Sequence, residues 1–225
     1  MRKKIKNKFL EDIRFGIEIE VEFPQVKDSY GLIEKNRLIR GWEMDFDGSL
    51  ENGAEYRPKD KNHLYFNEDC IDQIKEIIGL IKAHKGNIRP TCGLHIHIDT
   101  KTFTREEIVN ITKTFYNHQD KIYKDFKVIK SRESHNAKKL NKRMVASLTP
   151  SKITAIAKGR TAFKEDMFQD RDFGLNLYAM AIHGTIEFRF FNGTIQPRNI
   201  KSNIKWAIEF CLSNAKNGNE KRKRR

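Results

Sequence analysis

Three segments of the sequence alternate residue by residue between apolar and ionisable side chains, and they constrain the fold more than any other feature. They are residues 15–23, 94–99 and 185–191. Alternate side chains of a β-strand point to opposite faces, so each segment predicts a strand with one apolar and one polar face. We therefore expect an α+β fold: an antiparallel sheet with a polar, concave active-site face and amphipathic helices packed on the other face.

The polar faces of these predicted strands carry acids, imidazoles and one guanidinium. Adjacent glutamates on one strand face repel each other unless cations neutralise them. Carboxylate oxygens are the preferred ligands of Mg²⁺, and an imidazole ligand also admits Mn²⁺. The side chains concerned are Glu18, Glu20 and Glu22 on the first strand, His95, His97 and Asp99 on the second, and Glu187 and Arg189 on the third.

Each pattern taken singly also fits a surface without function. A solvated sheet face shows the same alternation, two histidines can lie on a surface, and Glu187 with Arg189 can form an ordinary ion pair. However, the chain has only 7 histidines, and two of them lie in one otherwise apolar segment. The conjunction of the three segments therefore favours a metal site.

Other segments predict the elements around these strands. An isoleucine stripe at helical spacing predicts a helix over 67–85, and a capping-box spacing opens another over 104–127. Pro197 suits the first turn of a last helix over 198–215. We also expect a short helix at 150–157 and strands at 42–46, 54–57, 87–99, 144–148 and 174–180.

The chain is strongly basic, with a formal net charge of +14 over 225 residues. Such a surplus attracts phosphates, nucleic acid or acidic polymers, although solvated lysines explain it nearly as well. Residues 221–225 are all basic. We expect one domain over residues 1–215 and a flexible basic tail over 216–225.

The cysteines and the hydropathy pattern bear on the compartment. The 3 cysteines are scattered, which argues against a disulfide framework and against a thiolate zinc site. No apolar run approaches the roughly 20 residues that span a bilayer, and no secretion signal is evident. We expect a cytoplasmic protein without a membrane partner.

Four blocks combine these polar residues with glycines, at residues 15–22, 45–55, 92–99 and 184–194. In order, they resemble the ExE, DxS…GxE, GxHxH and EFR motifs of the glutamine synthetase and glutamate–cysteine ligase superfamily. The similarity is greatest to its stand-alone, phage-type amidoligases, where Asn176 matches a frequent Leu-Asn pair. A phage-encoded member would act in the host cytoplasm.

The resemblance implies a glutamine synthetase-like catalytic domain, with ATP and Mg²⁺ as cofactors. His97 and Arg189 would contact nucleotide phosphate, and Arg189, Glu55 and Asp47 are the implied catalytic residues. The implied metal ligands are Glu18, Glu20, Glu55, His95 and Glu187.

The expected reaction is ATP-dependent joining of a carboxylate to an amine through an acyl phosphate. Lys158 and Arg160 could close over the phosphates, or belong to a solvated loop. The chain has no room for the N-terminal domain of the large synthetases, so amine-activating groups cannot be transferred. Asp166, Asp170 and Asp172 could replace them, or form a solvated loop.

Two other functions fit the same residues. A metal-dependent nuclease or phosphoesterase would also use ExE, HxH and a basic surface. A non-enzymatic nucleic-acid-binding or virion-associated protein would use the basic tail. The substrates, small molecules or peptides, cannot be read from the sequence, and neither can the oligomeric state.

Overall fold

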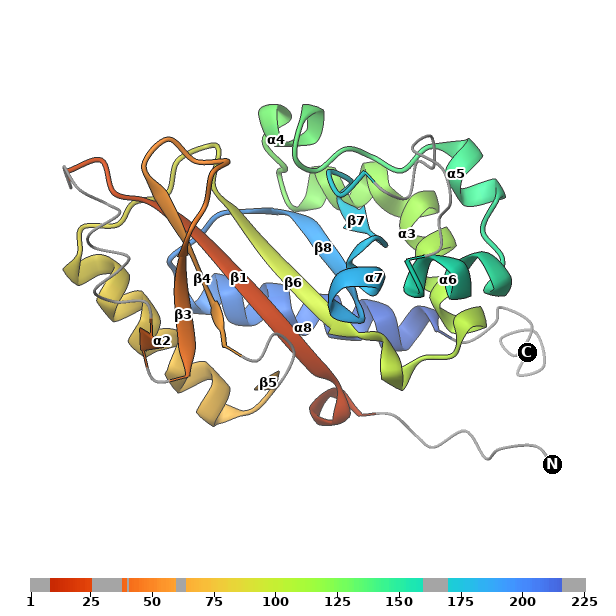
Figure 1. Cartoon of the computed structure of the whole chain (residues 1–225), viewed down its shortest axis with the longest axis horizontal. Helices are drawn as coiled ribbons and strands as arrows, with labels where there is room; N and C mark the ends of the chain where they lie inside the picture. Colours follow the sequence, from red (N-terminus) through yellow and green to blue (C-terminus); the bar gives the residue numbers. More distant parts are fainter. Residues whose placement is uncertain (1–8, 26–37, 40, 60–63, 160–169, 216–225) are drawn as a thin grey trace.

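The computed structural model describes residues 9–25, 38–39, 41–59, 64–159 and 170–215, and the predicted tail lies outside them (Figure 1). Its strands are β1 (Arg14–Glu22), β2 (Leu38–Ile39), β3 (Trp42–Phe46), β4 (Gly53–Pro58), β5 (Leu64–Tyr65), β6 (Gly93–Asp99), β7 (Leu175–Asn176) and β8 (Thr185–Asn192). Its α-helices are α2 (Glu68–Ala83), α3 (Arg105–Asp125), α4 (Lys130–Ser134), α5 (Lys142–Ala146), α6 (Pro150–Ala157), α7 (Ala179–His183) and α8 (Pro197–Asn214). Short 3-10 turns form at Leu10–Asp12 and Thr100–Thr102.

The described strands form one 8-stranded sheet in the order β2-β3-β4-β1-β6-β8-β7, with β5 beside β1. Every pair of neighbouring strands in it is antiparallel. β1 therefore lies between β4 and β6 in the middle of the sheet (Figure 1). The predicted α+β class with an antiparallel sheet is confirmed.

Helices α2, α3 and α8 bury the apolar face, and Figure 1 shows α8 running behind the central strands. Phe188 of β8 is fully buried there and makes edge-on ring contacts with Phe115, Trp206 and Phe210. The predicted helices over these three segments are confirmed to within two residues at each end. No helix in the described part of the chain is long and apolar enough to cross a membrane.

A β-bulge interrupts the pairing of β6 with β8. Leu94 pairs with Phe191 and Ile96 pairs with Phe188, so β8 carries one extra residue at this point. The bulge breaks the alternation, and both Phe190 and Phe191 are buried, with ring centroids 4.2 Å apart. Bulges of this kind re-aim neighbouring side chains, here beside Arg189.

Two predicted strands are wrong. Residues 144–148 lie mainly in helix α5, because the Asn141 side chain caps its first turn by accepting from the amide of Met144 at 2.9 Å. Residues 174–180 form only the two-residue strand β7, because the Asn176 carboxamide accepts from the amide of Tyr178 at 2.8 Å and turns the chain into α7. The strand predicted from residue 87 begins only at Gly93.

Helix α7 also departs from the expectation that helices pack only on the apolar face. Tyr178, Ala179, Ile182 and His183 line a pocket together with the polar residues of β1, β6 and β8. α7 therefore stands over the polar face of the sheet. It ends at Gly184, whose φ of 70° is the left-handed conformation that glycine adopts without strain.

Replacing Phe188 by alanine tests the aromatic core. Because the ring is fully buried, we expect Phe188→Ala to lower the free energy of unfolding by about 3–5 kcal/mol, measured by urea titration. Phe46 is 54% exposed, so Phe46→Ala should stay within about 0.5 kcal/mol of wild type. Equal losses in the two variants would contradict the described core.

Candidate functional site

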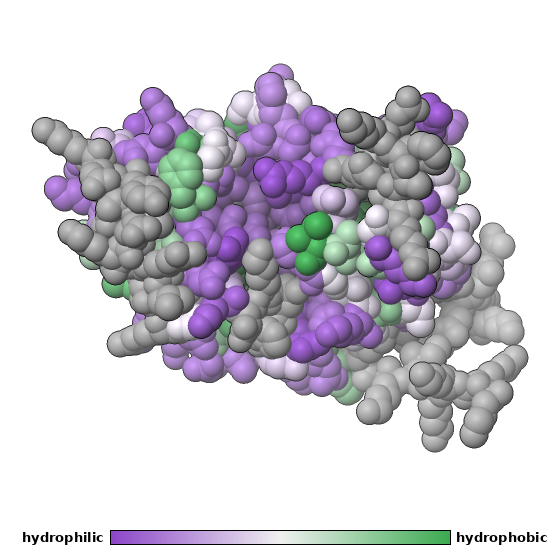
Figure 2. All heavy atoms as spheres, viewed as in Figure 1, coloured by the Kyte–Doolittle hydropathy of each residue, from purple (hydrophilic) through white to green (hydrophobic). Residues whose placement is uncertain are grey.

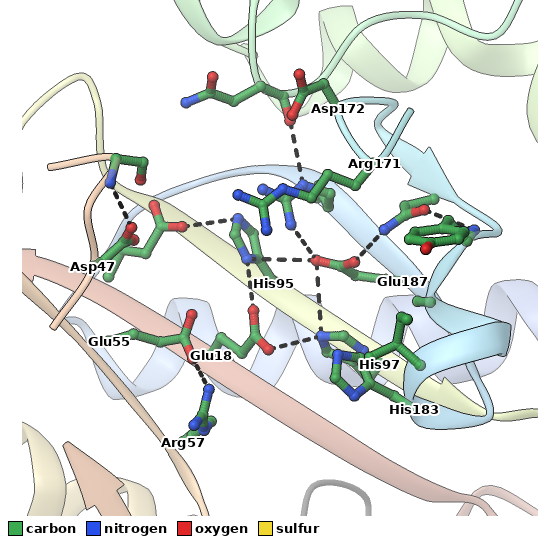
Figure 3. Close-up of a pocket in the computed structure, with 18 residues that line it drawn as sticks. Glu18, Asp47, Glu55, Arg57, His95, His97, Arg171, Asp172, His183 and Glu187 are labelled. Atoms are coloured by element: carbon green, nitrogen blue, oxygen red, sulfur yellow. Dashed lines mark hydrogen bonds and ion pairs between the residues drawn. The ribbon is translucent and has the colours of Figure 1, made fainter. Parts of the chain in front are cut away.

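The strand register brings the predicted site residues together on one face of the sheet. Glu18 of β1 lies opposite His95 of β6, and His97 lies opposite Glu187 of β8. Glu20 lies opposite Glu55 of β4. Side chains from four strands, spread over most of the chain, thus point into one volume (Figure 3).

Carboxylates and imidazoles are in direct contact at the centre of this volume. Glu18 lies between the two histidines, with Oε2 2.9 Å from His95 Nδ1 and Oε1 3.2 Å from His97 Nε2. Glu187 Oε1 is 3.5 Å from His95 Nδ1 and 3.7 Å from His97 Nε2. Glu20 Oε1 is 3.2 Å from His95 Nε2.

Among the residues that line this pocket, two buried ring nitrogens have no hydrogen-bond partner in the described part of the protein. They are Nε2 of His95 and Nε2 of His97, although carboxylate oxygens lie 3.2 Å from both. A cation that accepts lone pairs from both the nitrogens and the oxygens would satisfy this arrangement. Ligand atoms of Glu18, His97 and Glu187 all lie within 4.8 Å of one another, which suits a single metal ion. The geometry thus adds His97 to the candidate ligands, whereas the resemblance implied phosphate contact for it.

Donors outside this centre hold the carboxylates in place. Glu187 accepts from Arg189 Nη1 and from Asn176 Nδ2, both at 2.7 Å. Glu55 Oε1 accepts from Arg57 Nη1 at 2.9 Å, and Glu20 Oε2 accepts from the backbone amide of Gly93. The sequence analysis missed Arg57, although it lies two residues after Glu55 on the same strand face and the alternation could have found it.

The pocket above this floor has a volume of about 450 Å³. Asp47 and Ser49 line it on the β3–β4 side, and Tyr178, Ile182 and His183 line it on the α7 side. Figure 2 shows the centre of this face hollowed and mainly hydrophilic. The sequence did not predict these α7-side residues as part of the site. It also did not predict Asn136 and Arg171, which line the pocket as well.

Some predicted residues lie outside the pocket. Lys158 is exposed at the end of α6 and is not among the lining residues, and Arg160 and Asp166 lie outside the described residues. Asp172 does line the pocket, whereas Asp170 binds Lys138 Nζ at 3.1 Å. Glu22 accepts from the Thr91 hydroxyl at 2.8 Å and does not line the pocket.

A family model described as "Putative amidoligase enzyme" matches residues 25–211. The chain belongs to this amidoligase family. The description indicates an enzyme of the ligase type, in agreement with the motifs of the sequence. No curated protein matches the chain significantly. The matched range begins after β1, so Glu18 and Glu20 are linked to the site of this family member by the sheet register.

Burial and neighbouring charges set the protonation of the amidoligase site. Burial opposes ionisation of Glu18, but His97 and His95 outweigh it and hold the pKa of Glu18 well below its ordinary value. The pKa of Glu187 is lowered in the same way, by His97 and Arg189 against burial. Burial lowers the pKa of His97, but Glu18 and Glu187 raise it further, so its net shift is upward.

Glu55 behaves in the opposite way. Burial, and then the charge of Glu18, raise the pKa of Glu55 from 4.5 to about 8, even though Arg57 opposes the shift. Without added cations the folded protein therefore keeps Glu55 protonated at neutral pH. The charges of Glu20 and Asp47 add to this shift, so the site favours the uptake of positive charge.

The raised pKa of Glu55 makes the cation-free protein less stable as the pH rises. The folded state binds a proton that the unfolded state releases between about pH 4.5 and about pH 8, so the free energy of unfolding falls over that range. In urea titrations with EDTA, Glu55→Gln should gain stability relative to wild type across this window and gain no more above it. Burial lowers the pKa of His97, and the largest causes that raise it are Glu18 and Glu187, which both proteins retain, so the larger part of the difference reports on Glu55. A difference that does not change with pH would contradict the assignment.

Proposed function

We propose that this amidoligase family member uses ATP and divalent cations to join a carboxylic acid to an amine. The observation that carries the proposal is the convergence of Glu18, His97 and Glu187 around two buried imidazole nitrogens that lack hydrogen-bond partners among the described residues. A glutamine synthetase-like fold, a phage origin and a cytoplasmic location belong to the same proposal.

The side chains of the pocket fit hard divalent cations. Six carboxylates and three guanidinium groups line it, so its floor is acidic although the whole chain carries a charge of +14. Carboxylate oxygens with one or two imidazoles suit Mg²⁺ and also Mn²⁺. When bound, such cations would neutralise the charge on the phosphate oxygens of ATP. The proposed ligands are Glu18, Glu20, Glu55, His95, His97 and Glu187.

The proposed reaction has two steps. A carboxylate oxygen of the acid attacks the γ-phosphorus of ATP, the bond to the β-phosphate oxygen breaks, and ADP leaves. The amine nitrogen then attacks the acyl carbon of the acyl phosphate, inorganic phosphate leaves, and the amine loses a proton as the amide forms. The proposed substrates are small molecules or peptides, and the pocket volume of about 450 Å³ lies in the range of small-molecule sites.

Arg189 is the protein cation best placed to act on the phosphate. Its guanidinium lines the pocket and is fixed by Glu187 Oε1 at 2.7 Å and by the carbonyl oxygen of Asn136 at 3.4 Å. A guanidinium fixed in advance can stabilise charge that develops on phosphoryl oxygens without reorganising during the reaction. Arg189 is therefore the proposed catalytic cation, with Glu55 and Asp47 on the opposite wall.

Removing single ligands tests the proposal. Purified protein with ATP, Mg²⁺ and mixtures of candidate acids and amines should release phosphate only when both substrates are present. Glu18→Gln and Glu187→Gln should each reduce this release by about a hundredfold or more, because each removes a carboxylate that faces the cations. Glu106→Gln, on the exposed face of α3, is the matched control and should retain full activity.

Three outcomes would contradict the ligase proposal. Phosphate release that persists in both ligand variants would exclude the assigned site. Metal-dependent cleavage of labelled DNA or RNA without ATP would favour the nuclease or phosphoesterase alternative. Nucleic-acid binding that survives EDTA and falls steeply with salt, without phosphate release, would favour a non-enzymatic binding protein.

A further inference from the structure

Two carboxylates of the proposed cation site have one oxygen committed to a donor outside it. Glu20 Oε2 accepts from the amide of Gly93 and lies 3.8 Å from Arg132 Nη1, whereas Oε1 lies 3.2 Å from His95 Nε2. Glu187 Oε2 accepts from Asn176 Nδ2 at 2.7 Å. Its Oε1 is the oxygen nearest both histidines, and it also accepts from Arg189 Nη1 of the pocket at 2.7 Å. Each carboxylate thus presents one oxygen to the imidazoles.

Arg132 comes from a helix outside the sheet, and its guanidinium is fixed by hydrogen bonds. It projects from the short helix α4, only 1% of it is exposed, and it donates to the carbonyl oxygens of Thr91 and Arg189, each at 2.9 Å. Its guanidinium occupies the space where a side chain at position 93 would begin, so a Cβ on Gly93 would collide with it. Arg132 therefore links the segment just before β6 to the interior of β8 and places a fixed positive charge beside Glu20.

The way in which a carboxylate binds affects which cation is preferred. Ca²⁺ takes six to eight oxygen ligands in flexible geometry and readily accepts both oxygens of one carboxylate. Mg²⁺ requires near-octahedral geometry, and an octahedral site is best built from carboxylates that each give one oxygen. Donors that occupy the second oxygen therefore disfavour Ca²⁺.

We propose that Arg132 and Asn176 are positioning residues that limit Glu20 and Glu187 to one metal-facing oxygen each, and so select Mg²⁺ or Mn²⁺ over Ca²⁺. The inference rests on the proposed cation site and adds to it a determinant of metal specificity. Neither residue provides a ligand. Both act through the carboxylates that they hold.

Cation binding to the full chain tests this inference without reference to activity. Isothermal titration with Mn²⁺ and with Ca²⁺ gives two dissociation constants, whose ratio measures selectivity. Wild type should prefer Mn²⁺. In Asn176→Ala the preference should fall by about tenfold, because the freed Oε2 of Glu187 can then join the coordination of Ca²⁺. In Arg132→Met it should fall by less, because the Gly93 amide still holds Glu20 Oε2 after the guanidinium is removed. Arg132→Lys keeps the positive charge and should recover part of the preference.

Controls separate selectivity from folding. Arg143→Met, on the exposed surface of α5, should leave the ratio unchanged, and circular dichroism should show that every variant is folded. If Arg132→Met does not fold, Arg132→Lys and Asn176→Ala still decide the question. A merely structural role would weaken the binding of both cations and leave the ratio as in wild type.

Two negative results have different meanings. If wild type binds Mn²⁺ but the ratio is the same in folded Asn176→Ala and Arg132→Lys, the selectivity inference is wrong and the cation site stands. If wild type binds neither cation, the proposed site itself is refuted, and the selectivity inference with it.

Discussion

The burial of several carboxylates beside two imidazoles, on one face of an antiparallel sheet, is the interaction on which the rest of this structure depends. Ionised carboxylates are costly to bury without partners, and here the partners are histidines, arginines and backbone amides. Glu18 has an imidazole at each oxygen, and Glu187 has a guanidinium and a carboxamide. Glu55 shows that this compensation is incomplete, because its pKa rises to about 8 despite the neighbouring Arg57. Such a site is suited to taking up positive charge from solution.

The sheet accommodates this concentration of charge because the charged side chains of its central strands lie on one face and their apolar side chains on the other. Behind the charged residues, α2, α3 and α8 bury an aromatic and aliphatic core in which Phe188 contacts four other rings. Above them, α7 and the β3–β4 hairpin enclose a pocket that remains open to ligands. One strand thus contributes both to the core and to the site, since Phe188 lies between Glu187 and Arg189.

The residues at the centre of the site could be predicted because they follow the simplest periodicity of a strand. The alternation in residues 15–23 and 94–99 fixed which face Glu18 and His95 occupy. The order of the motifs then pointed to the amidoligase family, whose model matches residues 25–211. The long helices could be predicted equally well, since their apolar stripes and caps are local features of the sequence.

The remaining features depend on contacts between segments that are distant in the sequence. Nothing near Arg132 indicates that its guanidinium will lie against Gly93, and nothing in residues 174–180 separates a strand from a turn followed by α7 except the side chain of Asn176. The acidic cluster itself joins strands that are far apart in the sequence, and this has a consequence for biosynthesis. Glu18 meets His95 once β6 has paired with β1, but Glu187 arrives only with β8, which is synthesised after β1 and β6. A nascent chain on the ribosome therefore carries an incomplete acidic cluster until β8 has emerged and docked.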